Sequence, residues 1–152
     1  MQRLVDSPAL RALDVLVGDW TLEIPDPPLG YDVVRGTASF AWLKGDIVLV
    51  QRSTMEAPEF PDGFVFYGVD AATGRLVAHT WDSRGVVREF DLSFEDGVLR
   101  MSRPLTEGES FAQRLTLTLS DDGTTFAGPV EMARDGANFE HDMEFVYRRV
   151  GS

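Results

Sequence analysis

Residues 86–102 read VVREFDLSFEDGVLRMS and show the strand-and-turn pattern of this chain most clearly. Phe90, Leu92 and Phe94 alternate there with polar residues, which is typical of a strand with one buried face, and Val86 and Arg88 continue the same face. Glu95-Asp96-Gly97 is a tight-turn sequence, because glycine adopts the positive φ that short hairpins need. A second strand follows from Val98 to Ser102. The stretch therefore predicts an antiparallel hairpin.

The same pattern of strand and turn fills the chain after Asp19. Turn sequences such as Lys44-Gly45-Asp46 and Ser120-Asp121-Asp122-Gly123 separate the alternating segments. One helix is expected before them, with Ser7 as its N-cap and Pro8 in its first turn. Ten strands are expected, at residues 20–24, 35–43, 47–54, 63–69, 75–81, 86–94, 98–102, 111–119, 124–133 and 139–148.

Ten consecutive short strands without a crossover helix predict an all-β fold, an antiparallel up-and-down β-barrel. A meander of this length closes because closure removes its unpaired edges. The short N-terminal helix is expected to close one end. No linker or repeat divides the chain, so residues 1–152 are expected to form a single domain. A β-sandwich is the alternative architecture.

The composition excludes several classes of function. The formal net charge is −11, which argues against binding to nucleic acid or to an anionic membrane surface. The chain has no cysteine, so disulfides, thiol nucleophiles and thiolate metal sites are excluded. It has two histidines, too few for a three-histidine metal site within one chain. No metal site and no phosphate-binding glycine loop is recognised.

The start of the chain predicts the compartment. Residues 1–13 read MQRLVDSPALRAL, with charges inside the first apolar stretch and no small-residue cleavage site. The longest aliphatic run, Ile47 to Val50, is far shorter than the roughly 20 residues of a spanning helix. A cytoplasmic protein without a membrane partner is expected. The sequence sets no oligomeric state.

The loops predict where a ligand would enter. In a meander the turns alternate between two ends, and the four links that share an end with the helix are short. Three links at the other end, residues 25–34, 55–62 and 103–110, are long and hold six of the eight prolines. Binding groups gather on such loops. That end is therefore the expected mouth, although long loops over a filled barrel would give the same pattern.

Side-chain alternation places a few polar residues inside the barrel. Three strands that begin at the mouth each have a polar residue at the second inward position: Arg88, Gln113 and His141. The strand that ends there adds Gln51 and Ser53. Trp81 is a further candidate, while His79, on the same face, has no decided orientation. Burying an Arg or a His costs free energy unless the side chain is paired. We therefore expect these groups either to bind a polar ligand or to have partners within the barrel.

The segment Leu16-Val17-Gly18-Asp19-Trp20 resembles the calycin signature of lipocalins and fatty-acid-binding proteins. The resemblance implies that Trp20 closes the barrel floor and that a basic residue of the last strand, Arg149 or else Arg148, packs across its ring. Such a cation over an indole contributes about 0.5–2 kcal/mol. Both residues would be structural.

Further runs, among them residues 40–45, 50–52, 82–88, 111–114 and 120–123, resemble a broad bacterial family of small, uncharacterised calycin-like barrels. A more distant similarity is to nitrobindins, which bind haem through a histidine of the last strand, where His141 lies here. The spacing from His141 to Tyr147 differs in parity from the nitrobindin pattern, and the glycine-rich start of the first strand is missing. Haem is therefore not the expected cofactor, and the sequence indicates no other cofactor.

Three functions remain open. The first is binding of a small hydrophobic molecule, with an anionic head on Arg88 and His141 above an apolar floor, in a cavity of a few hundred cubic ångströms. The second is an isomerase or cyclase in which His141 moves a proton and Arg88 holds an oxyanion. The third is a haem-binding barrel, or a solid barrel that docks a protein through Leu29, Tyr31 and Phe60 exposed on its rim.

Overall fold

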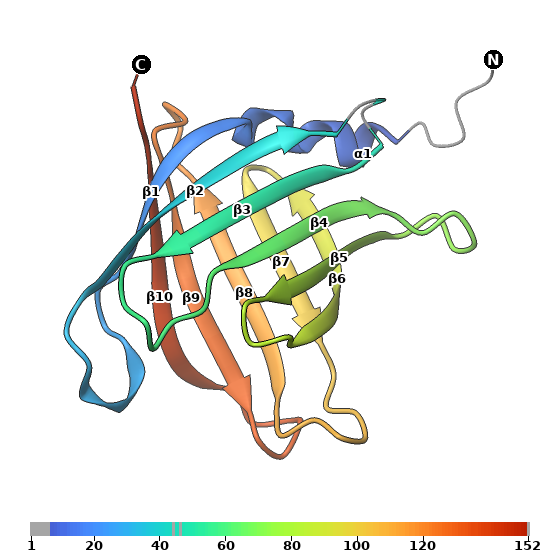
Figure 1. Ribbon diagram of the computed structural model, residues 1–152. Coiled ribbons are helices and arrows are strands. Elements are labelled where there is room, and N and C mark those ends of the chain that lie inside the picture. The colour runs from blue at the N-terminus through green and yellow to red at the C-terminus, as the bar shows by residue number, and fades with distance from the viewer. Residues whose placement is uncertain (1–6, 44, 46, 152) are drawn as a thin grey trace.

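The computed structural model describes residues 7–43, 45 and 47–151 and confirms the predicted all-β barrel. Ten antiparallel strands follow one another around a closed sheet, and the last strand pairs with the first (Figure 1). Each observed strand boundary lies within two residues of the predicted one. The strands are β1 (Gly18–Ile24), β2 (Val34–Trp42), β3 (Leu49–Met55), β4 (Gly63–Val69), β5 (Leu76–Asp82), β6 (Val87–Glu95), β7 (Val98–Arg103), β8 (Ala112–Leu119), β9 (Thr125–Ala133) and β10 (Glu140–Arg149).

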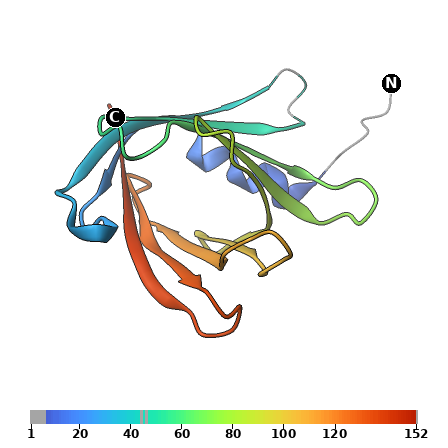
Figure 2. The ribbon, with the colours of Figure 1, turned by 60° about the horizontal axis from the view of Figure 1, so that its bottom comes forward.

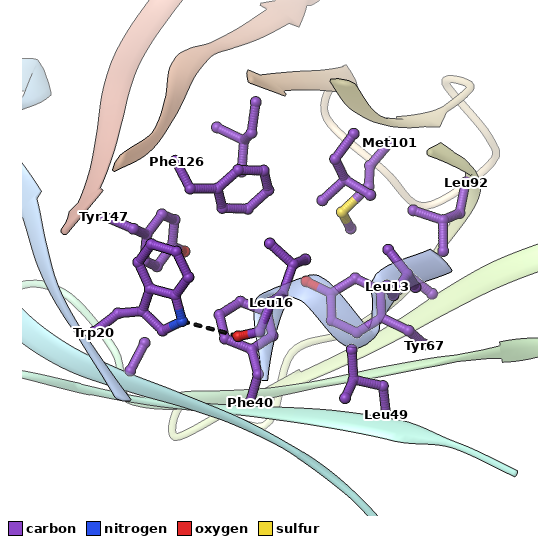
Figure 3. Packing of buried hydrophobic residues seen from close by; sticks show 14 of the residues in the cluster. Leu13, Leu16, Trp20, Phe40, Leu49, Tyr67, Leu92, Met101, Phe126 and Tyr147 are labelled. Carbon is purple, nitrogen blue, oxygen red and sulfur yellow. Dashed lines mark hydrogen bonds between the residues drawn. The ribbon is translucent and has the colours of Figure 1, made fainter. Parts of the chain in front are cut away.

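The N-terminal helix closes one end of the barrel, as predicted. It consists of α1 (Pro8–Arg11), which continues into the 3₁₀ helix η1 (Ala12–Leu16). The Ser7 hydroxyl accepts a hydrogen bond from the Leu10 amide at 3.2 Å, so Ser7 is the N-cap. Leu10, Leu13 and Leu16 are at most 2% exposed and pack on the barrel core. Leu13 and Leu16 are seen in Figure 3. The apolar face of the helix therefore closes this end of the barrel.

Trp20 and Arg149 join the two strands that close the barrel. The Trp20 ring is fully buried, and its Nε1 donates to the Leu16 carbonyl at 2.9 Å (Figure 3). The Arg149 guanidinium lies over the ring at 4.2 Å from its centre and also donates to three backbone carbonyls. This is the contact that the calycin resemblance implies for these two positions. Membership of that superfamily stays a prediction.

The two ends of the barrel differ as the sequence predicts. At the helix end the strands are joined by short turns, of which β6–β7 has only Asp96 and Gly97 between its strands. At the other end, the links at 25–33, 56–62 and 104–111 are longer, and Figure 2 looks toward this open end. The turn predicted at residues 44–46 lies partly outside the described residues. Residues 1–6, on which the expectation about the start of the chain partly rests, also lie outside them.

A β-bulge in β10 changes which of its residues face inward. The register with β9 shifts by one residue between His141 and Met143, so that Asp142 is an extra residue on β10. Below the bulge Met143, Phe145 and Tyr147 face the interior, as predicted. Above it the alternation is reversed, and His141 points outward.

None of the helices in the described part of the chain has the length and apolar character that crossing a bilayer requires.

Candidate ligand-binding cavity

The barrel encloses a cavity of about 540 Å³ that reaches the open end. This agrees with the expected few hundred cubic ångströms and lies in the range of small-molecule sites. Inward-facing apolar side chains from most of the strands form its wall, and the long loops form its mouth. The apolar wall includes Leu22, Ile24, Val65, Phe90, Met101, Leu115, Leu117, Met143 and Phe145.

The mouth is rimmed by apolar side chains that are open to solvent. Leu29 is 90% exposed, and Tyr31 is 44% exposed and lies edge-on to Phe60, with ring centres 6.1 Å apart. All three line the cavity entrance. The docking hypothesis required this rim, but it also required a solid barrel, and the barrel is hollow.

Arg88 lies inside the mouth, as predicted, and a second arginine joins it. Arg88 follows the alternation of Phe90 and Leu92 on β6. Its guanidinium carbon lies 5.4 Å from the centre of the Phe111 ring, and that of Arg103 lies 4.8 Å from the same centre. Two guanidinium groups therefore contact one aromatic ring near the start of β8.

Arg103 is held in place by the residues around it. Its side chain is 4% exposed, its Nε donates to Gln113 Oε1 at 3.2 Å, and one Nη donates to the Phe111 carbonyl at 3.0 Å. Glu109 is its ion-pair partner at 3.3 Å. Burial lowers the pKa of Arg103, and the nearby charge of Arg88 lowers it further against the opposing effect of Glu109. Glu109 therefore offsets only part of the effect that burial and Arg88 have on the charged form of Arg103.

Two buried nitrogens of this pair have no partner among the described residues: Arg88 Nε and Arg103 Nη2. Buried polar atoms are nearly always hydrogen-bonded, and an unpaired donor on a charged group is costly. Guanidinium donors match carboxylate and phosphate oxygens. Of the two, Arg88 lines the cavity, so it is the group that an anion at the mouth would meet.

Gln51 and Ser53 also lie where alternation placed them, in a polar cluster on the cavity wall. Gln51 is 4% exposed. Its Oε1 accepts from the Tyr67 hydroxyl at 2.5 Å, and its Nε2 donates to the Tyr147 hydroxyl at 3.0 Å and to Ser53 Oγ at 3.4 Å. Burial raises the pKa of Tyr67 well above its usual value and that of Tyr147 to about 12, so both hydroxyls stay protonated.

The prediction for His141 is wrong, because the bulge turns its side chain out of the barrel. Its side chain is 49% exposed, and Nε2 lies 2.7 Å from Asp26 Oδ2. The other Asp26 oxygen accepts from the Glu144 amide at 2.8 Å. The hydrogen bond to Asp26 raises the pKa of His141. Although burial acts to raise the pKa of Asp26, the bonds from His141 and Glu144 lower it. His141 therefore fastens the β1–β2 loop and holds no ligand inside.

Asp142 takes the inward position that His141 was expected to fill. It lines the cavity. Burial raises its pKa, with the His141 charge opposing and the Asp26 charge adding to the shift. The bulge thus brings an acidic side chain into the cavity wall.

The undecided face of β5 is resolved. Ala78 is fully buried and Thr80 lines the cavity, so the opposite face, with His79, points outward. His79 lies 3.6 Å from Glu89 on the barrel exterior. Trp81 is 57% exposed and reaches the cavity only at its rim, so it belongs to the mouth.

Two charged residues near the mouth, Arg103 and Asp142, escaped the sequence interpretation. Arg103 continues the alternation of the buried Leu99 and Met101 on β7, and extending that predicted strand by one residue would have found it. Asp142 had no such signal, because a bulge leaves alternation intact on either side of it. In the described part of the chain, no three Asp, Glu or His side chains are grouped so that they could hold a metal ion.

Comparison with known proteins supports the architecture. No protein-family profile matches the chain, and no curated protein sequence matches it. Among solved structures, the barrel is similar to that of Rv2717c from M. tuberculosis, with a TM-score of 0.62 and 14% sequence identity over 95% of this chain and 99% of that chain. At this identity the likeness shows the ten-stranded fold alone.

Proposed function

We propose that the protein binds a small, largely apolar molecule with an anionic head inside its barrel. The single observation that carries this proposal is the cavity of about 540 Å³, with an apolar wall and the Arg88 side chain at its mouth. An apolar ligand body would remove the wall from water, which is the main source of affinity in such sites. The head would pair with Arg88, and the nearby charge of Arg103 would add to the attraction.

Three acidic residues, Glu59, Asp82 and Asp142, also line the cavity. Asp82 is occupied by Arg84, whose Nη2 lies 2.7 Å from its carboxylate. Asp142 has a raised pKa and so carries its charge less readily than an exposed carboxylate. Glu109 neutralises part of the Arg103 charge, but it lies 30% exposed at the edge. Arg88, whose Nε has no partner among the described residues, is therefore the group left for an anionic head.

An enzymatic role has weaker support. The proposed proton carrier, His141, lies outside the barrel in an ion pair with Asp26. Gln51 and the two protonated tyrosines, which line the cavity, bind and orient polar atoms rather than exchange protons near neutral pH. Binding is therefore the function that we propose.

The test uses three probes that share a ten-carbon chain and differ in the head: decanoate, 1-decanol and decyltrimethylammonium. Titration calorimetry on the intact chain is expected to give binding in the order carboxylate, alcohol, cation. Leu115→Trp fills the cavity from β8 and should abolish binding, while Thr118→Trp, exposed on the same strand, should leave it unchanged. Absence of binding by every probe, or equal binding to both tryptophan variants, would overturn the proposal.

A further inference from the structure

The cavity carries a second polar site, far from the arginine pair. It consists of Tyr67, Gln51 and Tyr147, which are 2%, 4% and 4% exposed (Tyr67 and Tyr147 appear in Figure 3). The Tyr147 ring packs against Phe40 and Phe126, and both of these pack against Trp20 at the closed end. Polar atoms this deep in an apolar core are costly unless they are bonded. The site lies at the bottom of the cavity, whereas Arg88 lies at its mouth.

The distances fix the direction of the hydrogen bonds. The contact of 2.5 Å between Tyr67 and Gln51 lies in the range of O–H···O bonds and is too short for a typical N–H···O bond. The amide oxygen of Gln51 therefore faces Tyr67, and its NH₂ group faces Tyr147 and Ser53. Gln51 thus donates to the Tyr147 hydroxyl, which acts there as an acceptor.

This direction leaves the hydroxyl proton of Tyr147 unused. A phenol is one donor as well as an acceptor, and among the described residues the Tyr147 hydroxyl is found only as the acceptor from Gln51. Because Tyr147 lines the cavity, its hydroxyl can donate this hydrogen bond to a ligand in the cavity. Gln51, itself fixed by Tyr67, prevents Tyr147 from turning its proton to the amide.

We infer that the ligand carries a second polar group, a hydrogen-bond acceptor at the end opposite its anionic head, which Tyr147 receives. The ligand class is thus a bifunctional amphiphile, such as an ω-hydroxy or keto derivative of an apolar carboxylate. This inference rests on the proposed function, because it takes the arginine pair as the site of the head. An unsubstituted chain would leave the Tyr147 proton without a partner.

The experiment compares unsubstituted carboxylates of eight to fourteen carbons with their ω-hydroxy counterparts, by titration calorimetry on the intact chain. A hydroxyl buried without a partner weakens binding, whereas a bonded one strengthens it. At the chain length that spans the cavity, the ω-hydroxy compound is expected to bind about 3- to 10-fold more tightly than its parent. At shorter lengths the hydroxyl should weaken binding.

Tyr147→Phe removes only the hydroxyl and keeps the ring packing. In this variant the preference should disappear while affinity for the parent carboxylate is kept. Tyr31→Phe removes a hydroxyl from the mouth and should keep the preference. A wild-type protein with no preference at any length, or a preference that survives in Tyr147→Phe, would overturn the inference and leave the proposed function standing. If no carboxylate of any length binds, both fail.

Discussion

The Arg149 guanidinium lies 4.2 Å from the centre of the Trp20 ring and donates to the carbonyls of Val15, Val17 and Gly123. One side chain of the last strand thereby ties together the first strand, the helix segment below it and the β8–β9 turn. The barrel has no free edge because β10 pairs with β1, and this contact secures that seam at the closed end.

Arg149→Ala is therefore expected to lower the free energy of unfolding by about 2–4 kcal/mol, from the lost cation–π contact and charge-assisted hydrogen bonds. Arg149→Lys should recover only part of this, because an ammonium lacks the planar fork. Chemical denaturation monitored by Trp fluorescence measures both. Arg148→Ala, on the exposed face of the same strand, is the control and should change stability by less than about 0.5 kcal/mol. Equal effects at the two positions would contradict the assigned role.

For Arg88 and Arg103, substitutions are expected to affect stability and ligand binding differently. Arg88→Met removes a buried unpaired donor, so stability should stay unchanged or rise by about 1 kcal/mol, while decanoate affinity falls at least about tenfold. Arg103→Met breaks bonds to Phe111 and Gln113 and should cost about 1–3 kcal/mol. Thermal unfolding and calorimetry measure the two effects. A clear loss of stability in Arg88→Met would mean that Arg88 is a structural residue.

The pair of His141 and Asp26 predicts a dependence on pH at the mouth. The pKa of His141 is raised above 6.5, so its stabilising charge is fully present below 6.5 and lost as pH rises through the raised pKa. The pKa of Asp26 is lowered below 3.8, so its contribution is present above 3.8 and lost on acidification through the lowered pKa. The β1–β2 loop is therefore held most firmly between these values.

NMR titration of the His141 ring from about pH 5 to about pH 8 measures this pKa. Hydrogen exchange of the Glu144 amide, which donates to Asp26, reports the loop contact and should lose protection over the same rise. In Asp26→Asn the pKa of His141 should fall and the Glu144 amide should be less protected at every pH. A His141 pKa that is identical in the two proteins would rule out the pairing.

Much of the fold follows from alternation and turn residues. Phe90 and Leu117 face inward where period-two alternation places them, and every strand was expected within two residues of its position. His141 was misplaced because one inserted residue reverses a strand's faces, and the bulge leaves no mark in hydrophobic periodicity. The polar cluster around Gln51 was found only in part, since its partner Tyr67 lies on a strand of nearly continuous apolar residues, GFVFYGV.

Gly128 makes a close approach that alternation also cannot reveal. A Cβ at this position would run into the backbone carbonyl of Thr116 on β8. Gly128→Ala should therefore destabilise the barrel by about 1–3 kcal/mol, because the two strands must separate. The control is Gly68→Ala, where the new methyl would meet Val48 at an ordinary 3.7 Å. Denaturant unfolding of the two variants distinguishes them, and a neutral Gly128→Ala would refute the tight spacing of β8 and β9.

The most direct test of the account is methyl NMR of the intact chain titrated with decanoate. Binding inside the barrel predicts shift changes at the cavity methyls of Leu22, Met101 and Leu117, with those of Val15 and Val150 on the exterior unmoved. Changes confined to exterior or rim methyls, or none at all, would contradict an interior ligand site.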